Sequence, residues 1–187
     1  MDFTRKNIEN IEVHFENVRP PKHKFDGEGG LREFVINELK SAYYFEKAML
    51  RSFPKIIKNS CSLELIDAMT RHHEETKLQV IRIENAFVVL KESIAMERCF
   101  IIESLLNSID NVIEDTKFGV VRDGGIILAM QRLEHFEIGT YSILATYLEN
   151  LGESKVSQLL EETINEEKIT ELRLSKIAQT IRFYAGT

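Results

Sequence analysis

The 187-residue chain has no tryptophan, only three prolines and two cysteines, and no long apolar run. No uninterrupted apolar stretch reaches the roughly 18 residues that a membrane-spanning helix needs, so we expect no such helix. The N-terminal residues 1–6 are not followed by an apolar stretch, which argues against a secretory signal. Cys61 and Cys99 lack the close spacing of a zinc site. We expect a cytoplasmic protein with two free thiols, and a disulfide stays open as the alternative.

Positive charge is also scarce. The chain has 24 Lys and Arg against 30 Asp and Glu, which gives a formal net charge of −6. This balance disfavours nucleic acid as a partner, and it disfavours docking on an anionic membrane surface. A glycine-rich phosphate loop, an HExxH pattern and a GxSxG pattern are absent from the sequence. Nucleotide-binding, protease and hydrolase functions therefore have little support.

Helical periodicity dominates what is present. From residue 31 onward, apolar side chains recur at steps of three and four residues, as in amphipathic helices. The first stripe stops just before Pro54, where we expect the first helix to end because proline cannot continue the hydrogen-bond ladder. Ser60 or Ser62 is the expected N-cap of a second helix that continues to about residue 90.

The second half of the chain repeats this pattern after a shorter amphipathic stretch over residues 101–112. Asp123 is the expected N-cap of the third long helix, and Gly152 is its expected stop. A fourth long helix restarts near Ser154, so the last two helices are antiparallel neighbours. The pattern predicts an all-α fold, namely an up-down four-helix bundle with an extra connecting helix between helices 2 and 3.

The chain divides into two parts. Residues 1–29 form an N-terminal arm, flexible or packed on, which Pro20-Pro21 and the glycines at 27, 29 and 30 separate from the rest. Residues 30–187 form the single bundle domain.

Several acidic residues occupy the apolar stripes. With 100° per residue, the apolar residues of the first, third and fourth long helices fall within about 40° of Glu46, Glu137 and Glu167, respectively. Glu134 lies about 60° from Glu137 on the same side, and Glu171 lies about 40° from Glu167. Each of these glutamates therefore faces the expected core or its edge.

The second long helix is less regular. His72 falls inside its apolar stripe, whereas Glu75 lies on the flank, roughly 100° from the stripe centre at Thr76. His72 and Glu75 are three residues apart and so remain neighbours on the helix surface. Tyr141, one turn from Glu137 on the third long helix, is positioned to pack and to hydrogen-bond a carboxylate.

An isolated carboxylate in an apolar interior is costly. A single such residue is more often a rim residue that reaches water, and this reading stays the alternative for each glutamate alone. Three centred glutamates on three helices would repel one another unless cations lay between them, and few basic residues share these faces. Carboxylate and imidazole ligands suit iron, manganese or zinc. Helix bundles build dinuclear sites from single glutamates and Glu-x-x-His pairs on facing helices.

Four stretches together carry a family resemblance: residues 42–47, 72–76, 134–141 and 166–171. In order and spacing they are similar to the bacterial YciE/YciF-type family, over roughly residues 31–180. The resemblance implies a ferritin-like, rubrerythrin-like bundle that forms a homodimer, a di-iron centre, and a role in stress responses without an established reaction. Carried over by position, the metal ligands that the resemblance implies are Glu46, His72, Glu75, Glu134, Glu137 and Glu167. The helical wheel adds Glu171 to this set.

Two positions depart from the broader ferritin pattern. Thr170 and Leu78 stand where the histidines of the two Glu-x-x-His pairs would lie, so the site has fewer nitrogen ligands. One function that follows is a carboxylate-bridged site of two metal ions, iron or else manganese or zinc, that reacts with oxygen or peroxide. The alternative is a non-catalytic structural or interaction protein of the stress response with a degenerate or empty site. A 24-subunit iron-storage shell has little support, because nothing in the sequence marks cage-forming surfaces.

Overall fold

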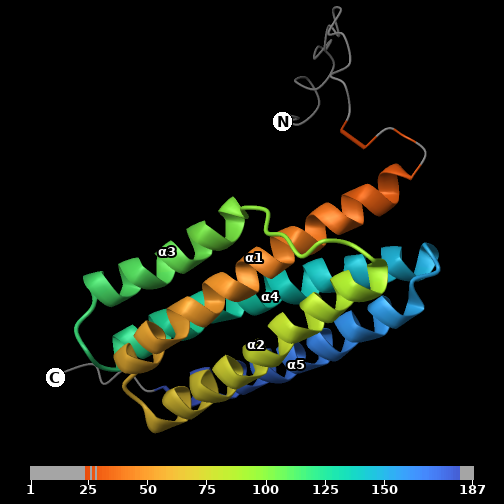
Figure 1. Cartoon of the computed structure of the whole chain (residues 1–187). Coiled ribbons are helices and arrows are strands. Elements are labelled where there is room, and N and C mark those ends of the chain that lie inside the picture. Colours follow the sequence, from red (N-terminus) through yellow and green to blue (C-terminus); the bar gives the residue numbers. More distant parts are fainter. Residues whose placement is uncertain (1–23, 26, 28, 182–187) are drawn as a thin grey trace, which may run out of the picture.

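The computed structural model describes residues 24–181 apart from residues 26 and 28, and this part contains five helices and no strand. The helices are α1 (Gly30–Asn59), α2 (Leu63–Leu90), α3 (Phe100–Asp115), α4 (Val120–Asn150) and α5 (Ser154–Thr180). The four long helices lie side by side, and the shorter α3 lies against α1 and α4 (Figure 1). None of the described helices is both long and apolar enough to cross a membrane.

The all-α prediction and the expected connecting helix agree with this architecture. The predicted arm of residues 1–29 falls almost entirely outside the described residues. Of its last residues, Phe25 packs edge-to-face on Phe34, with ring centroids 5.6 Å apart. Cys61 and Cys99 are free thiols, as expected.

Hydrogen bonds between helices establish the helix directions. The Arg32 guanidinium near the start of α1 donates to the Leu90 carbonyl at the end of α2, so these helices are antiparallel. The Asp123 carboxylate near the start of α4 accepts from the backbone N–H of Ser62 at the start of α2, so α2 and α4 run in the same direction. The up-down order that the sequence predicts therefore does not hold for this pair. The reason is that residues 91–99 and α3 carry the chain back to the end where α2 began (Figure 1).

The predicted end of the first helix at Pro54 is also wrong. Helix α1 continues through Pro54 to Asn59. This extension buries Ile56, whose exposure is 1%, and the Ser60 hydroxyl then donates to the Ile56 carbonyl at 3.0 Å. The predicted N-cap of α2 is confirmed at Ser62, whose side chain accepts from the backbone N–H of Leu65 at 3.3 Å.

Helix α4 begins at Val120 rather than after Asp123. Asp123 lies buried in the first turn, where its two oxygens accept from the backbone N–H groups of Cys61 at 2.7 Å and Ser62 at 2.8 Å. Asp123 thus accepts hydrogen bonds from the backbone N–H groups that precede α2, instead of capping its own helix. The predicted stop at Gly152 is confirmed, because this residue has a φ of 77° just after α4.

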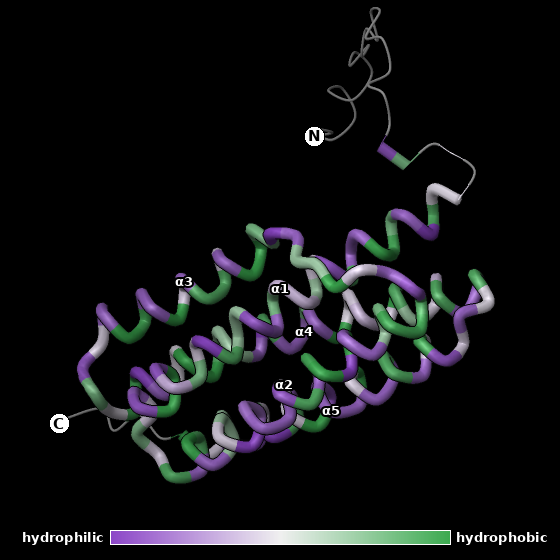
Figure 2. Tube along the Cα trace, viewed as in Figure 1, coloured by the Kyte–Doolittle hydropathy of each residue, from purple (hydrophilic) through white to green (hydrophobic). Residues whose placement is uncertain are grey.

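One contiguous apolar core joins all five helices. Apolar and polar residues alternate along each helix, as the hydropathy colouring shows (Figure 2). Five glutamate or histidine side chains among the described residues nevertheless lie inside this core, each at most 1% exposed: Glu46, His72, Glu134, Glu137 and Glu167.

Candidate metal centre

Four of these buried side chains form a compact cluster, which we call the His/Glu cluster: His72, Glu134, Glu137 and Glu167. One potential ligand atom from each lies within 4.8 Å of the others. The His72 Nε2 atom lies 3.1 Å from Glu134 Oε1 and 3.8 Å from Glu167 Oε2. Helices α2, α4 and α5 thus bring together four of the residues predicted from the sequence.

The helices also orient the imidazole. The His72 ring packs edge-to-face on Phe53 of α1, with ring centroids 5.0 Å apart. One turn later, the Thr76 hydroxyl donates to the His72 carbonyl at 2.9 Å, which satisfies this hydroxyl inside the core. With the ring held in this way, Nε2 faces the glutamates of the cluster.

Glu46 lies beside the cluster on α1. Its Oε1 atom accepts a hydrogen bond from the Tyr141 hydroxyl at 2.5 Å, whereas its buried Oε2 has no hydrogen-bond partner among the described residues. The expectation that Tyr141 hydrogen-bonds a carboxylate is confirmed, and that carboxylate belongs to Glu46 rather than to Glu137.

Glu75 lies at the edge of the cluster. Its side chain is 27% exposed, and its Oε2 lies 3.8 Å from His72 Nδ1. The same oxygen accepts from the Thr170 hydroxyl at 3.2 Å. Thr170, which stands where the broader pattern has a histidine, is fully buried and supports Glu75 in this way.

Like Glu46 and Glu75, Glu171 is a predicted ligand outside the four-residue cluster, and its own contacts are made with α4 and α5 side chains. Its side chain is 29% exposed, and its Oε1 accepts from the Ser175 hydroxyl at 3.0 Å. The same oxygen lies 3.7 Å from the Nε2 of His135, itself mostly exposed. Glu171 thus belongs to the surface between α4 and α5.

The cluster retains protons when no cation neutralises it. Burial raises the pKa of Glu137 and Glu167 well above the usual range, and the charges of neighbouring glutamates raise both further. Burial also raises the pKa of Glu46 to about 8, although the hydrogen bond from Tyr141 acts in the opposite direction. Burial disfavours charge on His72, but the adjacent Glu134 outweighs it and holds the pKa of His72 well above its ordinary value.

The donor set fits a metal ion. Buried side-chain atoms without a hydrogen-bond partner among the described residues include His72 Nδ1 and one oxygen each of Glu46, Glu134, Glu137 and Glu167. His72 Nε2 and Glu134 Oε1 have no polar partner closer than the 3.1 Å ion-pair contact that they make with each other. Such orphaned atoms are rare in protein interiors. Their convergence from four helices provides the oxygen and nitrogen ligands that iron, manganese and zinc accept.

Gln79 is the site residue that the sequence analysis missed. It is fully buried on α2, and its Nε2 donates to Glu167 Oε1 and, at 3.0 Å, to Glu166 Oε2. It lies seven residues after His72, which places it only about 20° from His72 around the helix. A helical wheel that included amides as well as carboxylates would have found it.

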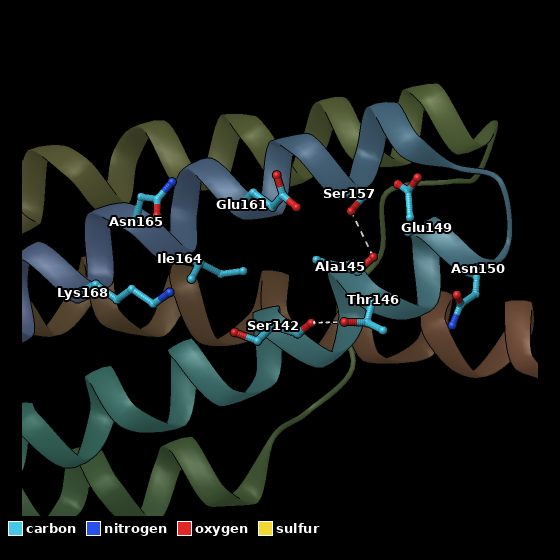
Figure 3. A pocket seen from close by; sticks show the side chains of 10 residues that line it. All are labelled: Ser142, Ala145, Thr146, Glu149, Asn150, Ser157, Glu161, Ile164, Asn165 and Lys168. Atoms are coloured by element: carbon cyan, nitrogen blue, oxygen red, sulfur yellow. Dashed lines mark hydrogen bonds between the residues drawn. The ribbon is translucent and has the colours of Figure 1, made fainter.

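The surface offers a separate cavity of about 550 Å³ between α4 and α5 (Figure 3). At its wall the Ser157 hydroxyl donates to the Ala145 carbonyl at 3.0 Å. None of the four cluster residues lines this cavity, so it is distinct from the candidate metal centre.

Comparison with known proteins gives concordant matches. The family model for a domain of unknown function, DUF892, matches residues 30–184. The chain is 37% identical to Protein YciF of Escherichia coli K12 over 151 residues, which cover 79% of this chain and 90% of YciF. The crystal structure of the E. coli stress protein YciF matches with a TM-score of 0.77 and 35% identity, covering 80% of this chain and 94% of that one. YcfI of Rhodopseudomonas palustris, described as a candidate structural protein, matches with a TM-score of 0.78 and 25% identity, covering 87% and 99%.

Proposed function

The chain belongs to the DUF892 family, and we propose that its four long helices form a ferritin-like bundle around a dinuclear metal site. The resemblance to the YciE/YciF-type family is confirmed by the sequence and structure matches to YciF. One observation carries the metal-site proposal, namely that buried oxygens and nitrogens without hydrogen-bond partners converge in the His/Glu cluster. A cation would satisfy them together.

Charge balance supports two ions rather than one. The four buried carboxylates are those of Glu46, Glu134, Glu137 and Glu167. Two divalent cations neutralise them, with His72 as a neutral nitrogen ligand. Glu75 at the cluster edge completes the ligand set on the solvent side. We propose iron as the metal, and the same donors accept manganese or zinc.

The proposed activity is a reaction with oxygen or peroxide during stress. A dinuclear iron site supplies redox chemistry when it is bound. The chain's own residues bind and orient the ions, Tyr141 holds Glu46 through its hydrogen bond, and the surrounding apolar core excludes water. The role in stress rests on the similarity to YciF, which is described as a stress protein. We also propose that the protein is located in the cytoplasm and forms a homodimer. Light scattering tests the dimer, because the measured mass should be about twice the 21.6 kDa mass of one chain.

Anaerobic titration of the metal-free protein with ferrous iron, followed by optical and Mössbauer spectroscopy, tests the proposal. We expect about two equivalents to bind per chain, because the four buried carboxylates balance two divalent charges. Glu137→Gln should lose at least one equivalent. Glu149→Gln, which changes an exposed glutamate on the same helix, is the matched control and should bind as the wild type does. Binding of no more than one equivalent by the wild type, or full binding by Glu137→Gln, would contradict the proposal.

A second candidate function is a structural or interaction protein without bound metal. The raised pKa values of Glu46, Glu137 and Glu167 favour it, because protonated carboxyls are tolerated in the core without a cation. The similarity to YcfI points the same way. Thermal unfolding with and without added iron, manganese or zinc separates the two functions. A site saturated at 100 times its Kd stabilises the fold by about 2.7 kcal/mol, whereas a structural protein should show no change.

A further inference from the structure

We propose that Gln79 is a positioning residue that orients Glu167 for metal binding, and that Glu166 and Arg82 hold Gln79 in place. This inference rests on the proposed metal site and assigns a role to residues outside the ligand set. It follows from the hydrogen bonds at the contact between α2 and α5.

The side-chain amide of Gln79 acts as a hydrogen-bond donor and not as an acceptor among the described residues. Its Nε2 donates to Glu167 Oε1 and to Glu166 Oε2, whereas its buried Oε1 has no hydrogen-bond partner among the described residues. Turning the amide around would place its oxygen against two carboxylates. An apolar side chain of similar size would fill this position without burying an unpartnered oxygen. The amide is therefore best explained by its two donated hydrogen bonds.

Arg82 fixes the outer end of this arrangement. Its guanidinium donates to Glu166 Oε2 at 3.0 Å and to Glu166 Oε1 at 2.8 Å, in a bidentate pair. The same guanidinium donates to the Thr163 hydroxyl at 2.8 Å. The Arg82 side chain is only 11% exposed, so solvent screens this pair weakly. The bidentate contact thereby holds the Glu166 carboxylate in one orientation, and this orientation selects that of the Gln79 amide.

The consequence lies at Glu167. Gln79 occupies Oε1 of this carboxylate, which leaves Oε2 as the atom available to a metal. Glu167 Oε2 is buried, has no hydrogen-bond partner among the described residues, and lies 3.8 Å from His72 Nε2. Hydrogen bonds of this kind orient metal ligands, and their loss weakens metal affinity by about 10- to 100-fold.

Manganese titration of the full chain, followed by the EPR signal of free Mn²⁺, tests the inference. Gln79→Leu should bind Mn²⁺ about 10- to 100-fold more weakly than the wild type does. Gln131→Leu is the matched control, because Gln131 also links two helices through its amide, donating to the Ser175 hydroxyl at 2.7 Å. It lies outside the cluster, so its loss should leave Mn²⁺ affinity unchanged. If Gln79→Leu does not fold, Gln79→Met replaces it with a more flexible side chain that also lacks a donor.

A second measurement needs no metal. In the metal-free wild type, the side-chain amide protons of Gln79 should exchange with solvent more slowly than those of Gln131. Gln79 is fully buried and donates to two carboxylate oxygens, of which that of Glu167 is buried and that of Glu166 is partly buried. Equal exchange rates, or unchanged Mn²⁺ affinity in the Gln79 variant, would overturn the positioning role and leave the metal site itself standing. A wild-type chain that binds no metal would overturn both proposals.

Discussion

At the scale of single residues, Tyr141 and Glu46 show how a buried carboxyl is kept in the core. The Tyr141 hydroxyl donates to Glu46 at 2.5 Å, and neither residue is exposed. We expect Tyr141→Phe to lower the free energy of unfolding of the metal-free protein by about 1–3 kcal/mol, because Glu46 loses its donor without gaining water. Urea denaturation measures this change.

The control for this prediction is Tyr43→Phe. The Tyr43 hydroxyl also donates to a glutamate, Glu84, at 2.7 Å, but that hydrogen bond is only partly buried. Water can replace the lost donor there, so the expected loss is below about 1 kcal/mol. Equal losses of unfolding free energy in Tyr141→Phe and Tyr43→Phe would show that the burial of Glu46 does not determine how much the lost hydrogen bond destabilises the fold.

The helical wheel predicted the centred glutamates well and the flanking ones poorly. Glu46, Glu137 and Glu167 are all buried, as their central positions indicate. Glu134, the more displaced of the two flanking residues, nevertheless joins the cluster, whereas Glu171 does not. The angular position of a residue around its own helix does not show whether another helix or solvent lies next to that side. On α5, the Glu171 flank meets the edge of α4 near His135, where solvent enters.

At the scale of helices, the approach of α3 to α4 depends on a glycine. A Cβ atom on Gly125 would lie 2.5 Å from a γ-methyl carbon of Val112 on α3, whereas a Cβ on Gly139 would meet nothing within 4 Å. We expect Gly125→Ala to destabilise the fold by about 1–3 kcal/mol through overpacking, because the valine side chain is stiff in a helix.

Gly139→Ala is the matched substitution in the same helix. It should stabilise the fold by up to about 1 kcal/mol, because alanine has the higher helix propensity and the space is open. Urea unfolding of both variants tests the pair. Stabilisation by Gly125→Ala would mean that α3 shifts freely on α4.

Helix boundaries were the least predictable feature, and the reason is long-range contact. Pro54 is a strong local stop signal, yet the burial of Ile56 against the core favours continuing α1. Asp123 is a good local N-cap, yet its carboxylate satisfies the backbone of Cys61 and Ser62, about 60 positions earlier in the sequence. In both cases a partner distant in sequence outweighs the local signal.

At the scale of the whole molecule, proton binding couples the buried cluster to the stability of the fold. The folded state raises the pKa of Glu137, Glu167 and His72 well above their ordinary values, and that of Glu46 to about 8. Between the ordinary glutamate value of 4.5 and about 8, the folded chain therefore binds more protons than the unfolded chain does. Stability of the metal-free protein is thus highest at the acidic end of this window and is lost as the pH rises through the folded pKa values.

Bound metal should reverse this dependence, because metal ligands must be deprotonated and the bound ion displaces the protons. We expect the urea midpoint of the chelator-treated protein to fall between about pH 5 and pH 8. The extra stability conferred by saturating Mn²⁺ should rise over the same interval. Glu46→Gln removes one titrating group and should flatten the metal-free slope without abolishing it. A metal-free midpoint that rises with pH across this window would contradict the assignment of protonated carboxyls to the core.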